Sequence, residues 1–216
     1  MRLRPPALAR QLSERLLPLY LISGDEPLQA GECADAVRQA ARAAGYANRE
    51  ILEVGGQFDW RSLGAEASAL SLFSERKLID LRIPKGKLGK DGGRALVDYC
   101  AAPPPDTLLL ITLPKLDKAQ WKTKWAQAVD KLGATVQIWP IEGRQLLQWL
   151  NQRLRAAGLQ PGPGVLDLLL EHTEGNLLAA RQEIEKLRLL HGAGRIDVDG
   201  LAEAISDSSR FDVFDL

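Results

Sequence analysis

The turn between a predicted strand and a predicted helix, residues 24–31, most resembles a chemical site. It reads Gly-Asp-Glu-Pro-Leu-Gln-Ala-Gly. A phosphate-binding loop, GxxxxGK[ST], needs close backbone approach at glycines, free N–H groups and a lysine. This turn has no lysine, Asp25 and Glu26 place negative charge where phosphates would lie, and Pro27 removes an N–H donor. Acidic residues at a helix start are favourable in themselves, so Gly24 and its neighbours predict a capped helix instead.

Two further segments carry residues found in nucleotide sites. Asp80 lies late in a predicted strand, but leucine follows it instead of the second acidic residue of a metal-and-water site. Residues 85–90, Lys-Gly-Lys-Leu-Gly-Lys, have no Ser or Thr after a Gly-Lys pair. We interpret them as a solvated basic loop, with a nucleic-acid contact as the alternative. No catalytic triad, glycosidase carboxylate pair or dinucleotide fingerprint is recognisable, so function is sought in binding.

The histidines and cysteines form no metal-binding pattern. His172 and His191 lie on predicted helices without partners at ligand spacing, and Cys33 and Cys100 are far apart with no CxxC. The sequence leaves a disulfide open but favours a reduced intracellular protein. We expect no metal and no other cofactor.

Composition narrows the class of protein. The 216 residues include 28 basic and 28 acidic side chains, giving zero net charge, with 45% hydrophobic and 26% charged residues. These values are typical of a globular protein and argue against one that coats nucleic acid, which usually has a basic surplus. No apolar stretch is long enough to span a membrane, and no apolar region follows the basic start, so we expect a cytoplasmic protein with no membrane partner.

The first two-thirds of the chain alternates strand and helix patterns. Strands are predicted at residues 19–23, 50–54, 77–83, 107–113 and 135–139. Helices are predicted from Pro27 to residue 44 and at residues 60–67, 92–101 and 118–132. The first helix has a polar face made of Glu32, Asp35, Arg38 and Arg42. This alternation predicts an α/β domain, residues 1–140, with a parallel sheet and helices on both faces.

After Pro140 the strand patterns stop. Helices are predicted at residues 144–157, 165–172, 177–190 and 198–205. In the third, Leu177, Ala180, Ile184 and Leu187 share one face, which suits a small bundle. Residues 141–210 are therefore predicted to form a small all-helical domain, and residues 211–216 to begin a further element.

A break in the apolar pattern suggests a docking site. In the helix near Trp60, Leu63, Ala67 and Leu70 can share the inward face, but Leu72 and Phe73 fall outside it. Two adjacent large apolar side chains cannot both point into one helical face. They either form an exposed docking cluster or close the end of the core.

Several stretches resemble the family of delta subunits of bacterial DNA polymerase III clamp loaders, over essentially the whole chain. The matching stretches are residues 19–28, 35–39, 70–73 and 174–187. The resemblance implies an AAA+ fold, with the α/β domain, a helical lid at residues 141–210 and a C-terminal collar domain that this shorter sequence lacks. It also implies a subunit that does not hydrolyse ATP. Leu178 stands where active AAA+ proteins carry an arginine, so Gly24, Asp25, Glu26, Pro27 and Leu178 would mark a degenerate nucleotide site.

The resemblance also implies a partner. Leu70, Ser71, Leu72 and Phe73 match the clamp-binding motif Gln-Leu-Ser/Asp-Leu-Phe, with Ala69 in the place of the glutamine. Leu70, Leu72 and Phe73 would then bind the beta sliding clamp and favour its open ring. The implied partners also include the gamma/tau and delta prime subunits, with primed DNA reached only through the assembled polymerase holoenzyme. The chain itself would have no catalytic site.

Two alternatives stay open. One is a divergent AAA+ ATPase subunit, which would bind ATP saturably. The other is a DNA-binding adaptor, whose DNA affinity would depend steeply on salt. Its candidate contacts are Lys85, Lys87, Lys90, Lys115, Lys118, Lys122 and Lys124.

Overall fold

The computed structural model describes residues 1–68 and 76–211. The chain forms two compact units, Met1–Pro140 and Ile141–Leu216. Each unit is described by itself. Within the described residues, no helix is long and apolar enough to cross a bilayer.

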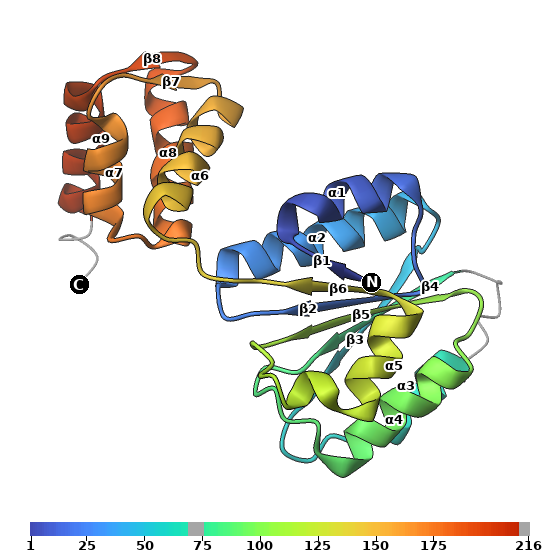
Figure 1. The fold of residues 1–216 in the computed structure, drawn as a ribbon. Helices are drawn as coiled ribbons and strands as arrows, with labels where there is room; N and C mark the ends of the chain where they lie inside the picture. Colours follow the sequence, from blue (N-terminus) through green and yellow to red (C-terminus); the bar gives the residue numbers. More distant parts are fainter. Residues whose placement is uncertain (69–75, 212–216) are drawn as a thin grey trace. The chain divides into compact units, whose positions relative to one another are not determined.

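The first unit is built on a six-stranded parallel sheet in the order β1-β6-β2-β5-β4-β3 (Figure 1). The strands are β1 (Arg2–Leu3), β2 (Leu19–Ser23), β3 (Asn48–Glu53), β4 (Lys77–Arg82), β5 (Thr107–Leu113) and β6 (Ala134–Gln137). Central strands of a sheet covered on both faces are expected to be apolar throughout. All five residues of β2 are indeed buried.

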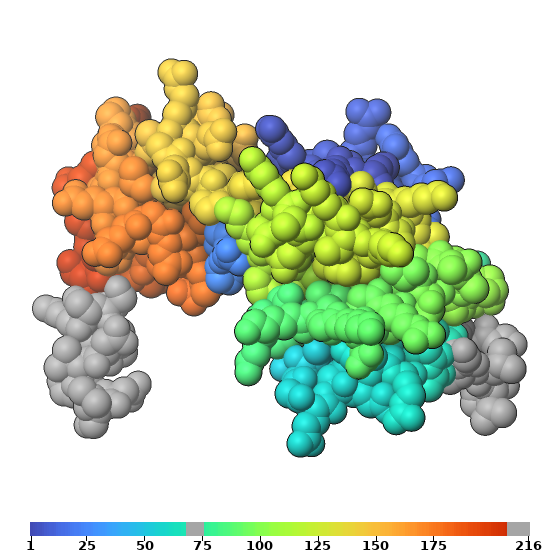
Figure 2. Space-filling view, turned by 60° about the horizontal axis from the view of Figure 1, so that its bottom comes forward, coloured from blue at the N-terminus to red at the C-terminus, as the bar shows by residue number. Residues whose placement is uncertain are grey.

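Helices cover both faces of this sheet. Helices α1 (Pro5–Glu14) and α2 (Pro27–Ala43) pack on one face, where Tyr20 and Ile22 point. Helices α3 (Arg61–Ser68), α4 (Gly89–Ala101) and α5 (Lys124–Leu132) pack on the other, with Leu19 and Leu21. Figure 2 looks onto the second face, with α5, α4 and α3 one after another. The two-residue alternation along β2 thus divides the core into two layers.

The predicted fold class is confirmed, with differences in detail. The strands predicted at residues 19–23 and 107–113 have the observed bounds. The sequence analysis missed β1, because a two-residue strand has no readable alternation, and it also missed α1. The helix predicted over residues 118–132 is wrong in its first part. A 3-10 turn, η1 (Gln120–Lys122), comes first, and Thr123 is extended before α5 begins.

The second unit contains α6 (Gly143–Ala156), α7 (Val165–Thr173), α8 (Leu177–His191) and α9 (Val198–Phe211). The predicted inward face of α8 is confirmed, since Leu177, Ala180, Ile184 and Leu187 are buried. The prediction that strands stop after Pro140 is wrong. Strands β7 (Leu159–Pro161) and β8 (Gly194–Ile196) pair in parallel, each too short for its pattern to be recognised. Helix α9 also extends beyond the predicted end at residue 205, through Phe211.

Candidate functional site at the carboxyl edge of the sheet

A crevice lies at the carboxyl ends of the two central strands. Strands β2 and β5 are neighbours, and the chain leaves β2 for α2 on one face and β5 for α5 on the other. Such a switch point is where open α/β sheets bind ligands. The crevice has a volume of about 470 Å³. It is lined by Gly24, Asp25, Pro27, Ala30, Glu53, Arg82, Ile83, Pro84, Thr112, Leu113 and Pro114.

Gly24 is required here by packing alone. A Cβ at this position would lie 2.3 Å from the Cβ and 2.7 Å from the carbonyl oxygen of Ile138. No side chain fits so close to a neighbouring backbone. The glycine therefore has a structural reason that is independent of any bound phosphate.

The start of α2 carries its own anion. Glu26 is the N-cap, and its carboxylate accepts hydrogen bonds from the N–H groups of Leu28 (3.2 Å) and Gln29 (2.7 Å). Pro27 occupies the first turn, where it has no N–H to offer. A phosphate at a helix start binds through these same orphan N–H groups. Glu26 thus occupies the donors that a phosphate would need.

Asp25 ties the turn to the loop after β5. Its Oδ1 accepts a hydrogen bond from the backbone N–H of Lys115 at 2.9 Å. The Lys115 ammonium in turn lies 4.8 Å from the ring centre of Trp139, a cation–π contact. The Lys115 ammonium is thus engaged with an indole ring, and the Asp25 carboxylate beside the crevice repels phosphate.

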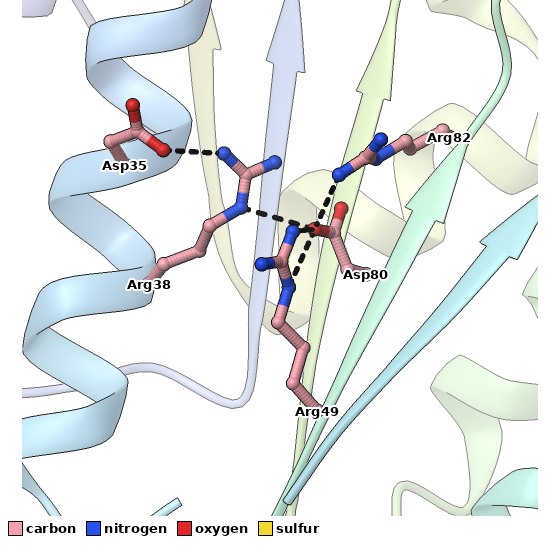
Figure 3. Close-up of polar contacts among 5 residues, drawn as sticks. All are labelled: Asp35, Arg38, Arg49, Asp80 and Arg82. Atoms are coloured by element: carbon pink, nitrogen blue, oxygen red, sulfur yellow. Dashed lines mark hydrogen bonds and ion pairs between the residues drawn. The ribbon is translucent and has the colours of Figure 1, made fainter.

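Asp80 forms the most highly connected ion-pair cluster in the described part of unit 1 (Figure 3). Its side chain is fully buried on the α2 face of β4, and its Oδ2 accepts from Nε of Arg38 at 3.0 Å and of Arg49 at 3.1 Å. A nitrogen of Arg82 lies 3.6 Å away, and Asp35 binds Arg38 at 2.7 Å. Burial raises the pKa of Asp80, but the hydrogen bonds from the two arginines outweigh it and lower the pKa below its usual value.

This cluster bears on two residues singled out in the sequence, Arg38 and Asp80. Arg38, predicted on the polar face of its helix, is only 20% exposed and reaches over the sheet to Asp80. The carboxylate of Asp80 is neutralised by arginines and so is poorly suited to hold a metal or act as a base. Within residues 1–68 and 76–211, no three His, Cys, Asp or Glu side chains gather as metal ligands. Sequence analysis missed Arg49 and Arg82; for Arg82 the available signal was its place two residues after Asp80 on one strand, which puts both side chains on the same face.

The other predicted site residues belong to the second unit or fall outside the described residues. Leu178 is in the first turn of α8 and 45% exposed, after Asn176 caps that helix. Leu70, Leu72 and Phe73 fall within residues 69–75, outside the described part of the chain. Of the helix leading to them, Leu63 is buried, and Trp60 and Ala67 pack on the same core.

The lysines of residues 85–90, the histidines and the cysteines were the remaining candidates for binding. Lys85, Lys87 and Lys90 are exposed. His172 lies 3.9 Å from Glu183 between α7 and α8. Cys33 and Cys100 are both unpaired, and burial raises the pKa of each thiol to about 11. Such thiols are protonated and unreactive at neutral pH.

A second hollow lies between α3 and α4. It has a volume of about 680 Å³, and its wall includes the aromatic pair Phe58 and Trp60, which meet edge to face with ring centres 5.1 Å apart. Its rim carries exposed ion pairs between Arg61 and Asp59 and between Arg94 and Asp98. Exposed ion pairs of this kind typically contribute only about 0–1 kcal/mol.

Comparison with known proteins identifies the family. Residues 20–137 match the family model described as DNA polymerase III, delta subunit. The chain is 31% identical over 213 residues to DNA polymerase III subunit delta of Escherichia coli, and 25% identical over 219 residues to that of Haemophilus influenzae. Each alignment covers 99% of this chain and 62% of the relative, so the chain spans about three-fifths of their length.

Solved structures show the same fold. The DNA clamp loader delta protein of Bacillus subtilis has a TM-score of 0.68 at 19% identity, over 92% of this chain and 61% of that one. The RuvB Holliday junction branch migration motor of Thermotoga maritima has a TM-score of 0.56 at 11% identity, over 93% and 68%. These likenesses confirm an AAA+-like fold. Because the family model matches more than half of the residues, the chain belongs to the DNA polymerase III delta subunit family.

Proposed function

We propose that this chain acts in clamp loading as a subunit that binds the beta sliding clamp and favours its open ring, without hydrolysing ATP. Family membership supports a role in the clamp loader. The observation that carries the non-hydrolysing part is the turn after β2, where the Glu26 carboxylate accepts from the N–H groups of Leu28 and Gln29. A nucleotide would have to displace this carboxylate without help from a lysine.

Clamp binding is proposed for Leu70, Leu72 and Phe73. Helix α3 leads directly to this segment, and burial of Leu63 fixes the helix on the sheet. A segment that starts from a rigid helix loses less conformational entropy on binding than a free peptide does. The ring opens only if the open form is bound more tightly than the closed form, since only differential affinity shifts an equilibrium. The gamma/tau and delta prime subunits are the proposed neighbours, with primed DNA reached through the complex.

Titration calorimetry with purified beta clamp tests the proposed contact. The double variant Leu72→Ser, Phe73→Ser should weaken clamp binding at least about 100-fold, because hot-spot apolar anchors each contribute about 2 kcal/mol or more. Leu189→Ser is the matched control, since Leu189 is 85% exposed on α8 in the other unit. Undiminished binding by the double variant would show that the anchor is misplaced.

Equilibrium dialysis with ATP tests the other half of the proposal separately. We expect no saturable binding at about 1 mM ATP, where even a weak site of about −4 kcal/mol would be half filled. Saturable binding would instead support the divergent ATPase. Clamp binding and ATP binding are independent measurements, so either half can fail alone.

A further inference from the structure

Strand β3 ends the six-stranded sheet with an open edge. It pairs with β4 and, among the described residues, with no other strand. Its residues are exposed except for Leu52, which is half-buried. Ile51 is 45% exposed, an unusual value for isoleucine in a strand of this sheet. An exposed edge with an uncovered apolar side chain is a template for pairing with another strand.

The backbone fixes which residues face that open edge. The N–H of Val54 donates to the carbonyl of Arg82 on β4 at 2.8 Å. Alternate residues of a strand direct their N–H and C=O groups to opposite sides. Arg49, Ile51 and Glu53 therefore direct theirs outward, away from β4. Their side chains share the α2 face of the sheet, where Arg49 meets Asp80.

These outward residues are complementary to themselves. If two β3 strands pair antiparallel around Ile51, Ile51 lies opposite Ile51 of the second copy, and Arg49 lies opposite its Glu53. The two-fold axis repeats each Arg–Glu pair, and the backbone gains about six hydrogen bonds. Opposite charges directly across an antiparallel pair are favourable. A parallel partner strand would not produce this reciprocal match.

Arg49 is already positioned for this contact. Its Nε and Nη2 bind Asp80, which holds the side chain in place, while the side chain remains 37% exposed. A guanidinium has five N–H donors, so donors remain for a second carboxylate. Glu53 is exposed in the register position beside Arg82. Both charges can therefore meet a partner without rearranging the Asp80 cluster.

We propose that β3 is a self-association edge, through which two copies of this chain join their sheets antiparallel about Ile51. The occupant is a second copy because an Arg-x-Ile-x-Glu strand supplies its own charge complement. The contact buries only two strand edges and few side chains, so it is weak and concentration-dependent.

Sedimentation velocity of the purified chain tests this, at loading concentrations from about 10 μM to about 1 mM, which span micromolar to millimolar dissociation constants. We expect a reversible shift from monomer to dimer over this range. Glu53→Lys should weaken the dimer at least about tenfold, because the two-fold axis converts two attractive pairs into two repulsive ones. Ile51→Pro should abolish it, because proline removes an outward N–H and leaves the bonds to β4 intact.

Glu50→Lys is the matched control. Glu50 is an exposed glutamate on the same strand, but it faces the other side of the sheet, opposite Leu52 of the second copy. The Glu50→Lys variant should dimerise like the parent, and all variants should keep the parent's circular dichroism spectrum. The proposal is overturned if the parent stays monomeric at about 1 mM, the weakest affinity considered. A dimer that survives both Glu53→Lys and Ile51→Pro, or that Glu50→Lys weakens equally, also overturns it.

Discussion

Replacing Asp80 by asparagine should destabilise the first unit substantially. The change keeps the shape of a fully buried side chain and removes the only charge that the three arginines share. Breaking a buried ion pair by removing one partner costs about 3–5 kcal/mol. Arg49 and Arg82 are 37% and 38% exposed and can turn toward water, so we expect the lower end, about 3 kcal/mol.

Urea unfolding followed by tryptophan fluorescence measures this loss. The first unit contains four of the five tryptophans, Trp60, Trp121, Trp125 and Trp139. With a urea slope of about 2 kcal/mol/M, a loss of 3 kcal/mol lowers the midpoint by about 1.5 M. Asp35→Asn is the matched control, because Asp35 is 65% exposed and binds Arg38 alone. It should cost under about 1 kcal/mol. Equal losses for both variants would refute the idea that the buried carboxylate anchors the cluster.

The difference in stability between the parent and Asp80→Asn should also depend on pH, in a direction that the pKa of Asp80 determines. The folded pKa of Asp80 lies below its usual value. Its stabilising contribution is therefore fully present above the unfolded pKa of about 3.9, and is lost as pH falls through the lower folded pKa. The gap between parent and Asp80→Asn should stay constant from pH 7 to about pH 5 and close below about pH 4. A gap that widened on acidification would contradict a depressed pKa.

Further predictions concern the turn after β2 and helix α2. Gly24→Ala should lower the free energy of unfolding by about 2 kcal/mol, measured by thermal unfolding, because the new Cβ meets the Ile138 backbone. Gly31→Ala in α2 has open space around the new Cβ and should raise the free energy of unfolding by about 0.5–1 kcal/mol. Glu26→Ala should lower stability by about 1 kcal/mol through loss of the N-cap, measured in the same way. Dialysis should show that Glu26→Ala still binds no ATP, because the turn lacks a lysine; recovery of binding would mean that the carboxylate alone blocks the site.

The architecture was predictable because β2 and β5 are predominantly apolar and are bounded by turn residues. For Arg38, the helical pattern could not predict the direction of the side chain. Its position around α2 is polar, but its direction depends on Asp80 of β4, which lies 42 positions later in the chain. The open edge at β3 was equally unreadable, since strand order is a long-range property. Strands β7 and β8 were missed because three residues hold no period that distinguishes a strand.

The turn after β2 differs from a nucleotide site in what satisfies the backbone N–H groups at the start of its helix. In a nucleotide site, the orphan N–H groups at a helix start remain open until phosphate binds, so the turn and the helix are stabilised by the ligand. Here the Glu26 carboxylate satisfies two of those groups from within the chain. Ile138 occupies the space that a Cβ at residue 24 would need. The turn is thus complete without a ligand. It follows that ATP should leave the melting temperature of this chain unchanged, and a rise that saturates with ATP would show that the turn still accepts phosphate.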